Sequence, residues 1–213
     1  MSEATIDEGY YENQRPEIAR LIPPTAKVIL DAGCGKGRLG ALLKQEIRDR
    51  KVFGIEYVAS IAREAEGVLD GVVVGDLQSM TITFAAGLFD CIVFADVLEH
   101  VTDPTTVLHR FQPYLKKDGF VLCSIPNIRH YTAIMKVIKG WRYEDFGIFD
   151  RTHLRFFSLR SMKQLLADAG YMVDHVQPRL VASRKMNVLN ALCFGRLNDF
   201  LAMQYILLAR PSR

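Results

Sequence analysis

Three glycines and a carboxylate stand close together early in the sequence, where their types and spacing suit the binding of a cofactor. Asp31 follows the apolar run 28–30, and Gly33, Gly35 and Gly37 come shortly after it. Glycines let a ligand approach the backbone closely because they carry no Cβ atom. A carboxylate at the same turn repels a pyrophosphate and attracts a cation by Coulomb's law. The turn therefore favours a cationic cofactor without phosphate over a dinucleotide.

Two further acidic residues follow the next two apolar segments. Glu56 ends the segment 52–56, and Asp76 follows the segment 71–75. A carboxylate at the position of Glu56 can accept hydrogen bonds from both hydroxyls of a ribose. The same position would serve a nicotinamide cofactor, and residues 35–40 also fit the dinucleotide spacing G-x-G-x-x-G. A nicotinamide-dependent oxidoreductase is therefore an alternative, although the last glycine of that spacing falls inside the predicted helix, one register late.

These residues need a framework of alternating strands and helices to position them. Apolar runs between turn residues predict strands, and apolar residues at helical spacing predict helices. The helix that begins at the Asp103-Pro104 cap is expected to stop just before Gly119. We expect a parallel sheet with helices on both faces. The predicted strands are 27–30, 52–56, 71–75, 89–95, 120–125, 173–180 and 204–209, and the predicted helices are 38–50, 58–69, 103–117 and 158–170.

Two segments of the sequence resemble motifs of one enzyme family. Residues 31–37, Asp-Ala-Gly-Cys-Gly-Lys-Gly, resemble motif I of the class I S-adenosylmethionine-dependent methyltransferases. Residues 89–100 resemble motif IV of that family and its exit, Leu-Glu-His. The resemblance covers about residues 10–209. It implies an α/β fold with a Rossmann-like, seven-stranded, mostly parallel sheet whose last strand is antiparallel, in one domain over residues 1–213.

The resemblance also implies S-adenosyl-L-methionine as cofactor, S-adenosyl-L-homocysteine as product, and a set of cofactor-binding residues. In the family, Glu56 would bind the ribose, Asp76 would accept from the adenine amino group, and Ala95 and Asp96 would lie against the methionine portion. An N-terminal helix at about residues 10–22 would fold over the cofactor. Alternatively, Glu56 is a solvated strand end and Asp76 caps a turn. The full set is Tyr11, Asp31, Gly33, Gly35, Glu56, Tyr57, Asp76, Leu77, Ala95 and Asp96.

Residues 127–157 form an insert that we expect to bind the methyl acceptor. A hydroxyl acceptor must lose a proton, and a positioned base typically adds about 10²–10⁴-fold to the rate. His153 is the first candidate for this base, with Asp150 three residues earlier to orient its ring, and His100 is the second. Alternatively, Asp150, Arg151 and His153 form a structural hydrogen-bond network before the next helix. The surrounding segment resembles ubiquinone-pathway O-methyltransferases, and more closely small methyltransferases associated with polysaccharide synthesis.

The insert also combines aromatic rings with cationic side chains. Arg129, Tyr131, Trp141 and Arg151 are the candidate acceptor-binding residues. Aromatic faces beside cations suit a sugar, an aromatic ring or an anionic acceptor. We therefore expect O-methylation of a small-molecule or glycan-linked hydroxyl. The alternatives are N- or C-methylation of a small molecule and a module that binds the cofactor without turnover.

Composition narrows the setting in which the chain works. The sequence has 213 residues, of which 49% are hydrophobic and 24% charged, and its net charge of +3 is too small to indicate nucleic acid as a partner. No apolar run is long enough for a membrane span, and the polar N-terminus is not a signal peptide. Cysteines, histidines and acids show no metal-ligand spacing, so we expect no metal. The four cysteines are interpreted as core thiols of a reducing compartment, so we expect a cytoplasmic location. The segment 183–202 is predicted to be a packed helical insert, or alternatively a homodimer face or a lid.

Overall fold

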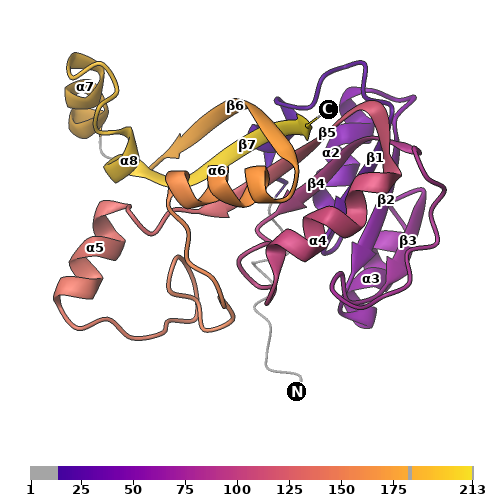
Figure 1. Ribbon diagram of the computed structural model, residues 1–213, viewed down its shortest axis with the longest axis horizontal. Coiled ribbons are helices and arrows are strands. Elements are labelled where there is room, and N and C mark those ends of the chain that lie inside the picture. Colours follow the sequence, from indigo (N-terminus) through magenta and orange to yellow (C-terminus); the bar gives the residue numbers. More distant parts are fainter. Residues whose placement is uncertain (1–13, 182–183, 213) are drawn as a thin grey trace. The chain divides into compact units, whose positions relative to one another are not determined.

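The computed structural model describes residues 14–181 and 184–212, which form two compact units. Of the described residues, the first unit contains 14–94 and 111–121, and the second contains 95–110, 122–181 and 184–212. Seven strands hydrogen-bond in the order β3-β2-β1-β4-β5-β7-β6. This is the expected Rossmann-like sheet, mostly parallel with one antiparallel pair, accompanied by helices (Figure 1).

The first unit is built from the repeating strands and helices that the apolar runs predict. Strands β1 and β4 pair in parallel, as do β1 with β2 and β2 with β3, and Figure 1 shows β1, β2 and β3 side by side. Strands β1 and β4 are mostly buried, which is why their sequences are almost continuously apolar, whereas the edge strand β3 is only half-buried. The elements are α1 (Pro16–Ala19), β1 (Val28–Ala32), α2 (Arg38–Glu46), β2 (Lys51–Glu56), α3 (Ala59–Glu66), β3 (Gly71–Val74) and β4 (Phe89–Ala95).

The second unit contains the antiparallel pair and most of the inserted segments. Strands β6 and β7 run antiparallel, with Val176 opposite Leu207, which confirms the expectation for the last strand. The elements that follow β4 are α4 (Pro104–Phe111), η2 (Gln112–Tyr114), β5 (Leu115–Pro126), α5 (Tyr131–Ile138), α6 (Leu159–Asp168), β6 (Tyr171–Leu180), α7 (Arg184–Leu192), α8 (Asn198–Leu201) and β7 (Ala202–Pro211). Among the described residues, none of these helices is long and apolar enough to cross a membrane.

The helix predicted at 103–117 is shorter than expected. Asp103 does cap its start, because its carboxylate accepts from the Thr106 amide at 3.0 Å. The α-helix ends at Phe111, and Pro113, which has no amide hydrogen, lies in the short 3-10 turn that follows. The prediction of a helix stop at Gly119 is therefore wrong. That glycine lies inside β5, where an added Cβ would come within 3.0 Å of two backbone carbonyl oxygens.

After β5, the helices α6, α7 and α8 lie at predicted positions, whereas α5 lies inside the insert 127–157, for which the sequence predicts no helix. Ser158 and Ser161 form a reciprocal capping box at the start of α6, as the predicted cap implies. Helices α7 and α8 occupy the predicted segment 183–202. The side chain of Leu192 is 72% exposed, and Met186 is also exposed. The interpretation of this segment as a packed insert is therefore wrong for these two side chains. Helical periodicity identifies an apolar face but not what covers it.

Candidate active site

The glycine-rich turn between β1 and α2 adopts backbone conformations that favour glycine. Gly33, Gly35 and Gly37 have φ angles of 86°, 52° and 75°, in the left-handed region. The amides of Gly33 and Cys34 both donate to the carbonyl oxygen of Ile55, at 2.8 and 3.0 Å. The turn is thus fixed against β2 by the backbone. A Cβ atom at Gly37 would come within 3.4 Å of Leu69 and Ala65, so this glycine also allows the turn to pack closely.

The carboxylate of Glu56 links this turn to the end of β2. One oxygen accepts from the Gly35 amide and the other from the Val58 amide, each at 2.9 Å. Glu56 is only 6% exposed, so it is not the solvated strand end that the sequence left as an alternative. The sequence did not predict that this side chain would brace the glycine turn. Each carboxylate oxygen has a second lone pair, so the ribose contact stays a prediction.

A second carboxylate, Asp31, is buried in the same turn region. Asp31 is 3% exposed, and its pKa is raised to about 7, first by burial and then by the nearby charge of Glu56. The guanidinium of Arg15 acts in the opposite direction. Because the charge of Glu56 disfavours the ionised form of Asp31, a phosphate beside the two acidic side chains would be disfavoured still more. This region therefore fits a cofactor that carries positive charge and no phosphate, as the sequence suggested.

The remaining predicted cofactor residues of the first unit differ in their surroundings. Asp76 caps a turn, because its carboxylate accepts from the Gln78 amide at 2.9 Å and from the Ser79 hydroxyl at 3.3 Å. Its role toward adenine stays a prediction beside this cap. Leu77 is buried, whereas Tyr57 is 66% exposed.

The expected N-terminal helix of residues 10–22 is represented among the described residues by α1 alone. Tyr11, the candidate on that helix, lies outside the described residues. Its contact with the cofactor therefore stays a prediction.

In the second unit, Asp96 adopts an uncommon backbone conformation directly after β4. Its φ angle is 55°, a left-handed value that costs energy for any residue with a Cβ atom. The Asp96 amide donates to the Ser124 carbonyl at 3.0 Å, and the Gln204 side-chain amide donates to its carboxylate. Ala95, next to it, is half-buried. The contacts from β5 and β7 thus hold Asp96 in this strained turn.

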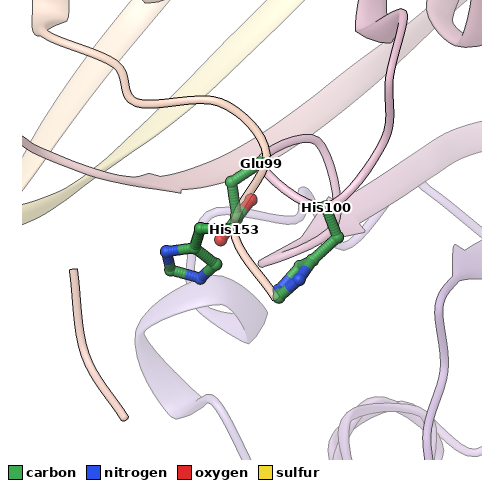
Figure 2. A group of neighbouring side chains, drawn as sticks. All are labelled: Glu99, His100 and His153. Carbon is green, nitrogen blue, oxygen red and sulfur yellow. The ribbon is translucent and has the colours of Figure 1, made fainter. Parts of the chain in front are cut away.

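The segment after Asp96 and the loop before α6 bring three metal-ligand-type side chains together. The amides of Leu154 and Arg155 donate to the Glu99 carbonyl at 2.8 and 3.0 Å, which joins the two segments. The rings of His100 and His153 lie 4.7 Å apart between centroids, at an angle of 72°. Figure 2 shows Glu99 and both histidines gathered at one place. Glu99 is 1% exposed and His153 8%.

Hydrogen bonds fix the same tautomer in both histidines. Nδ1 of His153 lies 2.9 Å from the Ile148 carbonyl oxygen, and Nδ1 of His100 lies 3.3 Å from the Thr152 carbonyl oxygen. A carbonyl oxygen can only accept, so each Nδ1 carries the proton. Each Nε2 therefore presents a lone pair. Nε2 of His100 is buried and has no hydrogen-bond partner.

The sequence predicts that Asp150 orients the ring of His153, but other groups contact both residues. The Asp150 carboxylate accepts from the amide and the hydroxyl of Thr152, at 2.8 and 2.6 Å. Oγ1 of that threonine lies 3.1 Å from Nδ1 of His100. Asp150 thus acts on the second histidine through Thr152, while the backbone of Ile148 orients the first. Because the ring of His153 bonds to a backbone carbonyl, residue types could not have indicated this contact.

Burial also favours the neutral form of His100. The pKa of this imidazole is lowered to about 4, mainly by burial and secondarily by the neighbouring His153. The Thr152 carbonyl and the charge of Asp150 partly offset this shift. His100 is therefore neutral at pH 7, with a lone pair on Nε2.

The predicted acceptor insert contains a cluster of aromatic rings that extends to His153. Trp141 stacks on Phe149 with centroids 4.8 Å apart and meets the edge of Tyr143 at 5.0 Å. Phe156 lies 6.2 Å from Trp141 and 6.5 Å from the His153 ring. Trp141 is 40% exposed, so the cluster keeps a surface available for contact. We call these four side chains, Trp141, Tyr143, Phe149 and Phe156, the aromatic cluster.

The two arginines predicted to bind the acceptor have acidic partners. Arg129 pairs with Asp199 at 3.0 Å and lies over the Phe200 ring, and Arg151 pairs with Asp145 at 2.6 Å. Tyr131 is exposed beside His130. Their roles in acceptor binding stay predictions.

Comparison with known proteins decides the family. A family model described as a methyltransferase domain matches residues 7–176. The chain belongs to the class I S-adenosylmethionine-dependent methyltransferases. Its cofactor is therefore S-adenosyl-L-methionine. The matched range includes the glycine turn at residues 31–37 and the Leu-Glu-His sequence at residues 98–100 of this methyltransferase.

Curated relatives of this methyltransferase include ubiquinone biosynthesis O-methyltransferases. The protein of Pectobacterium atrosepticum is 32% identical over 122 residues, 55% of this chain and 49% of the relative. That of Chromobacterium violaceum is 26% identical over 191 residues, 87% and 79%. A malonyl-[acyl-carrier protein] O-methyltransferase of Herminiimonas arsenicoxydans is 27% identical over 175 residues, 79% and 61%. The chain spans about half the length of the first curated relatives it matches.

Solved structures show the same fold at lower sequence identity. A methyltransferase from Thermotoga maritima, described as a possible histamine N-methyltransferase, has a TM-score of 0.67 and 18% identity, and the match covers 95% of this chain and 89% of that one. The plantazolicin methyltransferase, solved with S-adenosylhomocysteine, has a TM-score of 0.65 and 15% identity, covering 96% and 88%. These likenesses confirm the Rossmann-like fold.

Proposed function

We propose that this methyltransferase transfers the methyl group to a hydroxyl oxygen of a small-molecule or glycan-linked acceptor. The observation that carries the proposal is the pair of histidines, His100 and His153, each presenting an Nε2 lone pair. In the reaction, the acceptor oxygen bonds to the methyl carbon while the carbon–sulfur bond breaks and its electron pair stays on sulfur. The hydroxyl proton must leave, which an imidazole lone pair promotes. An amine acceptor has no such requirement.

The surroundings of His153 support an acceptor that contains a ring. The aromatic cluster begins 6.5 Å from this histidine and is partly exposed. Aromatic faces bind the apolar faces of sugars and stack on aromatic acceptors. The curated relatives above are named as O-methyltransferases, which supports oxygen as the accepting atom.

The free cysteines support a reducing compartment for the reaction. Cys34, Cys91 and Cys123 are buried thiols, and Cys193 is a free thiol that is half-buried. Thiols of this kind are typical of cytoplasmic proteins. We place the reaction in the cytoplasm on this ground.

Replacing His153 tests the acceptor side of the proposal. We expect His153→Ala to lower turnover at least about tenfold, because a positioned base is worth about 10²–10⁴-fold. The affinity for S-adenosylhomocysteine should be unchanged. Turnover with labelled methyl donor and a panel of phenols, sugars and nucleotide sugars, beside calorimetry, measures both quantities. The exposed His175→Ala is the matched control. Full turnover of the His153 variant on a hydroxyl acceptor would remove this residue from the mechanism, and turnover only on amines would refute oxygen as acceptor.

Replacing Glu56 tests the cofactor side. Glu56→Ala removes the carboxylate that braces Gly35 and that we expect to bind the ribose hydroxyls. We expect the affinity for S-adenosylhomocysteine to fall at least about tenfold, since charge-assisted hydrogen bonds are the strong ones. Calorimetry checks this, with the exposed Glu66→Ala as control. An unchanged dissociation constant in the Glu56 variant would refute the ribose contact.

A further inference from the structure

Glu99, His100 and His153 form a cluster whose donor atoms converge. One carboxylate oxygen and one nitrogen from each imidazole lie within 4.8 Å of one another (Figure 2). Two donor atoms that each lie about 2.1 Å from a single ion are at most about 4.2 Å apart. A side-chain shift of less than about 1 Å therefore brings all three donors to coordinating distance.

The histidines are prepared for coordination in the way that metal ligands are. A metal-binding imidazole usually donates its other ring N–H to a backbone carbonyl or a carboxylate, which fixes the tautomer and the ring orientation. His153 donates from Nδ1 to the Ile148 carbonyl, and His100 faces the Thr152 carbonyl in the same way. Asp150 extends this arrangement, because it accepts from the Thr152 hydroxyl that lies beside His100. Both Nε2 atoms are thus left as donors to an ion.

The buried position and the ligand types select the kind of ion. Nε2 of His100 is buried without a hydrogen-bond partner, and burying a polar atom in that state is costly. Two imidazoles and one carboxylate suit zinc and related divalent transition metals, and are poor ligands for calcium or magnesium, which prefer all-oxygen sites. Catalytic zinc sites use three protein ligands of this type and leave a position open.

We propose that Glu99, His100 and His153 bind one divalent transition-metal ion of the zinc class, with a coordination position open to an oxygen ligand. Metal binding goes beyond the proposed function. The role of the ion rests on that function: an acceptor hydroxyl bound at the open position would lose its proton at lower pH, as metal-bound water does. The imidazole lone pairs would then act on the acceptor through the ion instead of taking its proton directly.

Metal uptake by the whole chain tests the site without any acceptor. Protein freed of its purification tag is stripped with a chelator, dialysed against Zn²⁺ and analysed for bound metal. We expect one equivalent per chain. With Co²⁺ as the probe, visible absorption bands of a low-symmetry site with nitrogen ligands should appear. Glu99→Gln, His100→Ala and His153→Ala should each weaken binding at least about tenfold, whereas the exposed His109→Ala and His175→Ala should not.

Two further measurements separate a loss of metal binding from misfolding and from a loss of activity. Calorimetry with S-adenosylhomocysteine checks that each variant is folded, and Zn²⁺ should raise the melting temperature of the wild type but not of the three cluster variants. No uptake by the wild type, or equal uptake by wild type and cluster variants, would overturn the metal site. Uptake without any oxygen-methylated product would leave the metal site standing and overturn the proposed function. A product made equally fast by chelated and Zn²⁺-loaded enzyme would overturn the role of the ion.

Discussion

Replacing Asp31 with asparagine should make the cofactor-free protein more stable at pH 8 and weaken its binding of S-adenosylmethionine. The pKa of Asp31 is raised from 3.8 to about 7 by burial and by Glu56, so its ionised form disfavours the folded state. A shift of this size corresponds to on the order of 4 kcal/mol. The asparagine has no charge to bury, but it also has none to offer a sulfonium or ammonium group.

The pH dependence of unfolding shows whether ionisation of Asp31 destabilises the folded protein. Because the folded-state pKa of Asp31 is raised, its contribution to stability is fully present below about pH 4 and is lost as the pH rises to about 7. Urea unfolding at pH 4, 6 and 8 should show this loss in the wild type and a flatter profile in Asp31→Asn. The matched control is Asp49→Asn, because Asp49 is exposed and its pKa is lowered through Lys27. A less stable Asp31 variant at pH 8, or one with undiminished cofactor affinity, would contradict the prediction.

Arg50→Leu should destabilise the first unit more than any surface substitution in it. The Arg50 guanidinium is 3% exposed and donates to the carbonyls of Ala26, Ile22 and Pro23 at 3.1 to 3.2 Å. Leucine retains much of the apolar packing but leaves these acceptors without their donor. Leaving a buried acceptor without its donor costs about 1–3 kcal/mol, and here several carbonyls lose theirs together. Urea unfolding measures this loss.

The neighbouring arginine provides a control of the same type. Arg48 is exposed, and Arg48→Leu should change the free energy of unfolding by less than about 0.5 kcal/mol. Similar losses in the two variants would show that Arg50 does not hold the loop after α1 in place. Retained stability in Arg50→Leu would likewise show that Arg50 does not hold this loop in place.

The sheet and the cofactor turn could be predicted because their signals are local. A buried parallel strand such as β4 is a continuous apolar run, and its bounds agree with the sequence prediction. The positive φ angles at Gly33 and Gly35 follow from the residue types. The predicted helix after Asp103 is too long because the α-helix ends just before Pro113, well ahead of Gly119.

The acceptor side could be predicted only in part because it depends on contacts between distant segments. The sequence identifies His100 and His153 as chemically capable residues. Their spacing gives no sign that the distant His153 lies beside Glu99 and His100. The orientation of His153 by the Ile148 carbonyl is a backbone contact, which residue types do not encode. The exposed face of α7 depends on what packs beside it, and periodicity is silent on that.

The bracing of the glycine turn by Glu56 has a consequence for the thermodynamics of cofactor capture. The two hydrogen bonds, to Gly35 and Val58, order the turn as part of folding. Its backbone therefore has little conformational entropy left to lose when the ligand arrives. More of the interaction energy then appears as affinity, because a preorganised site loses less conformational entropy on binding. The carboxylate of Glu56 thus rigidifies the glycine turn before the cofactor binds.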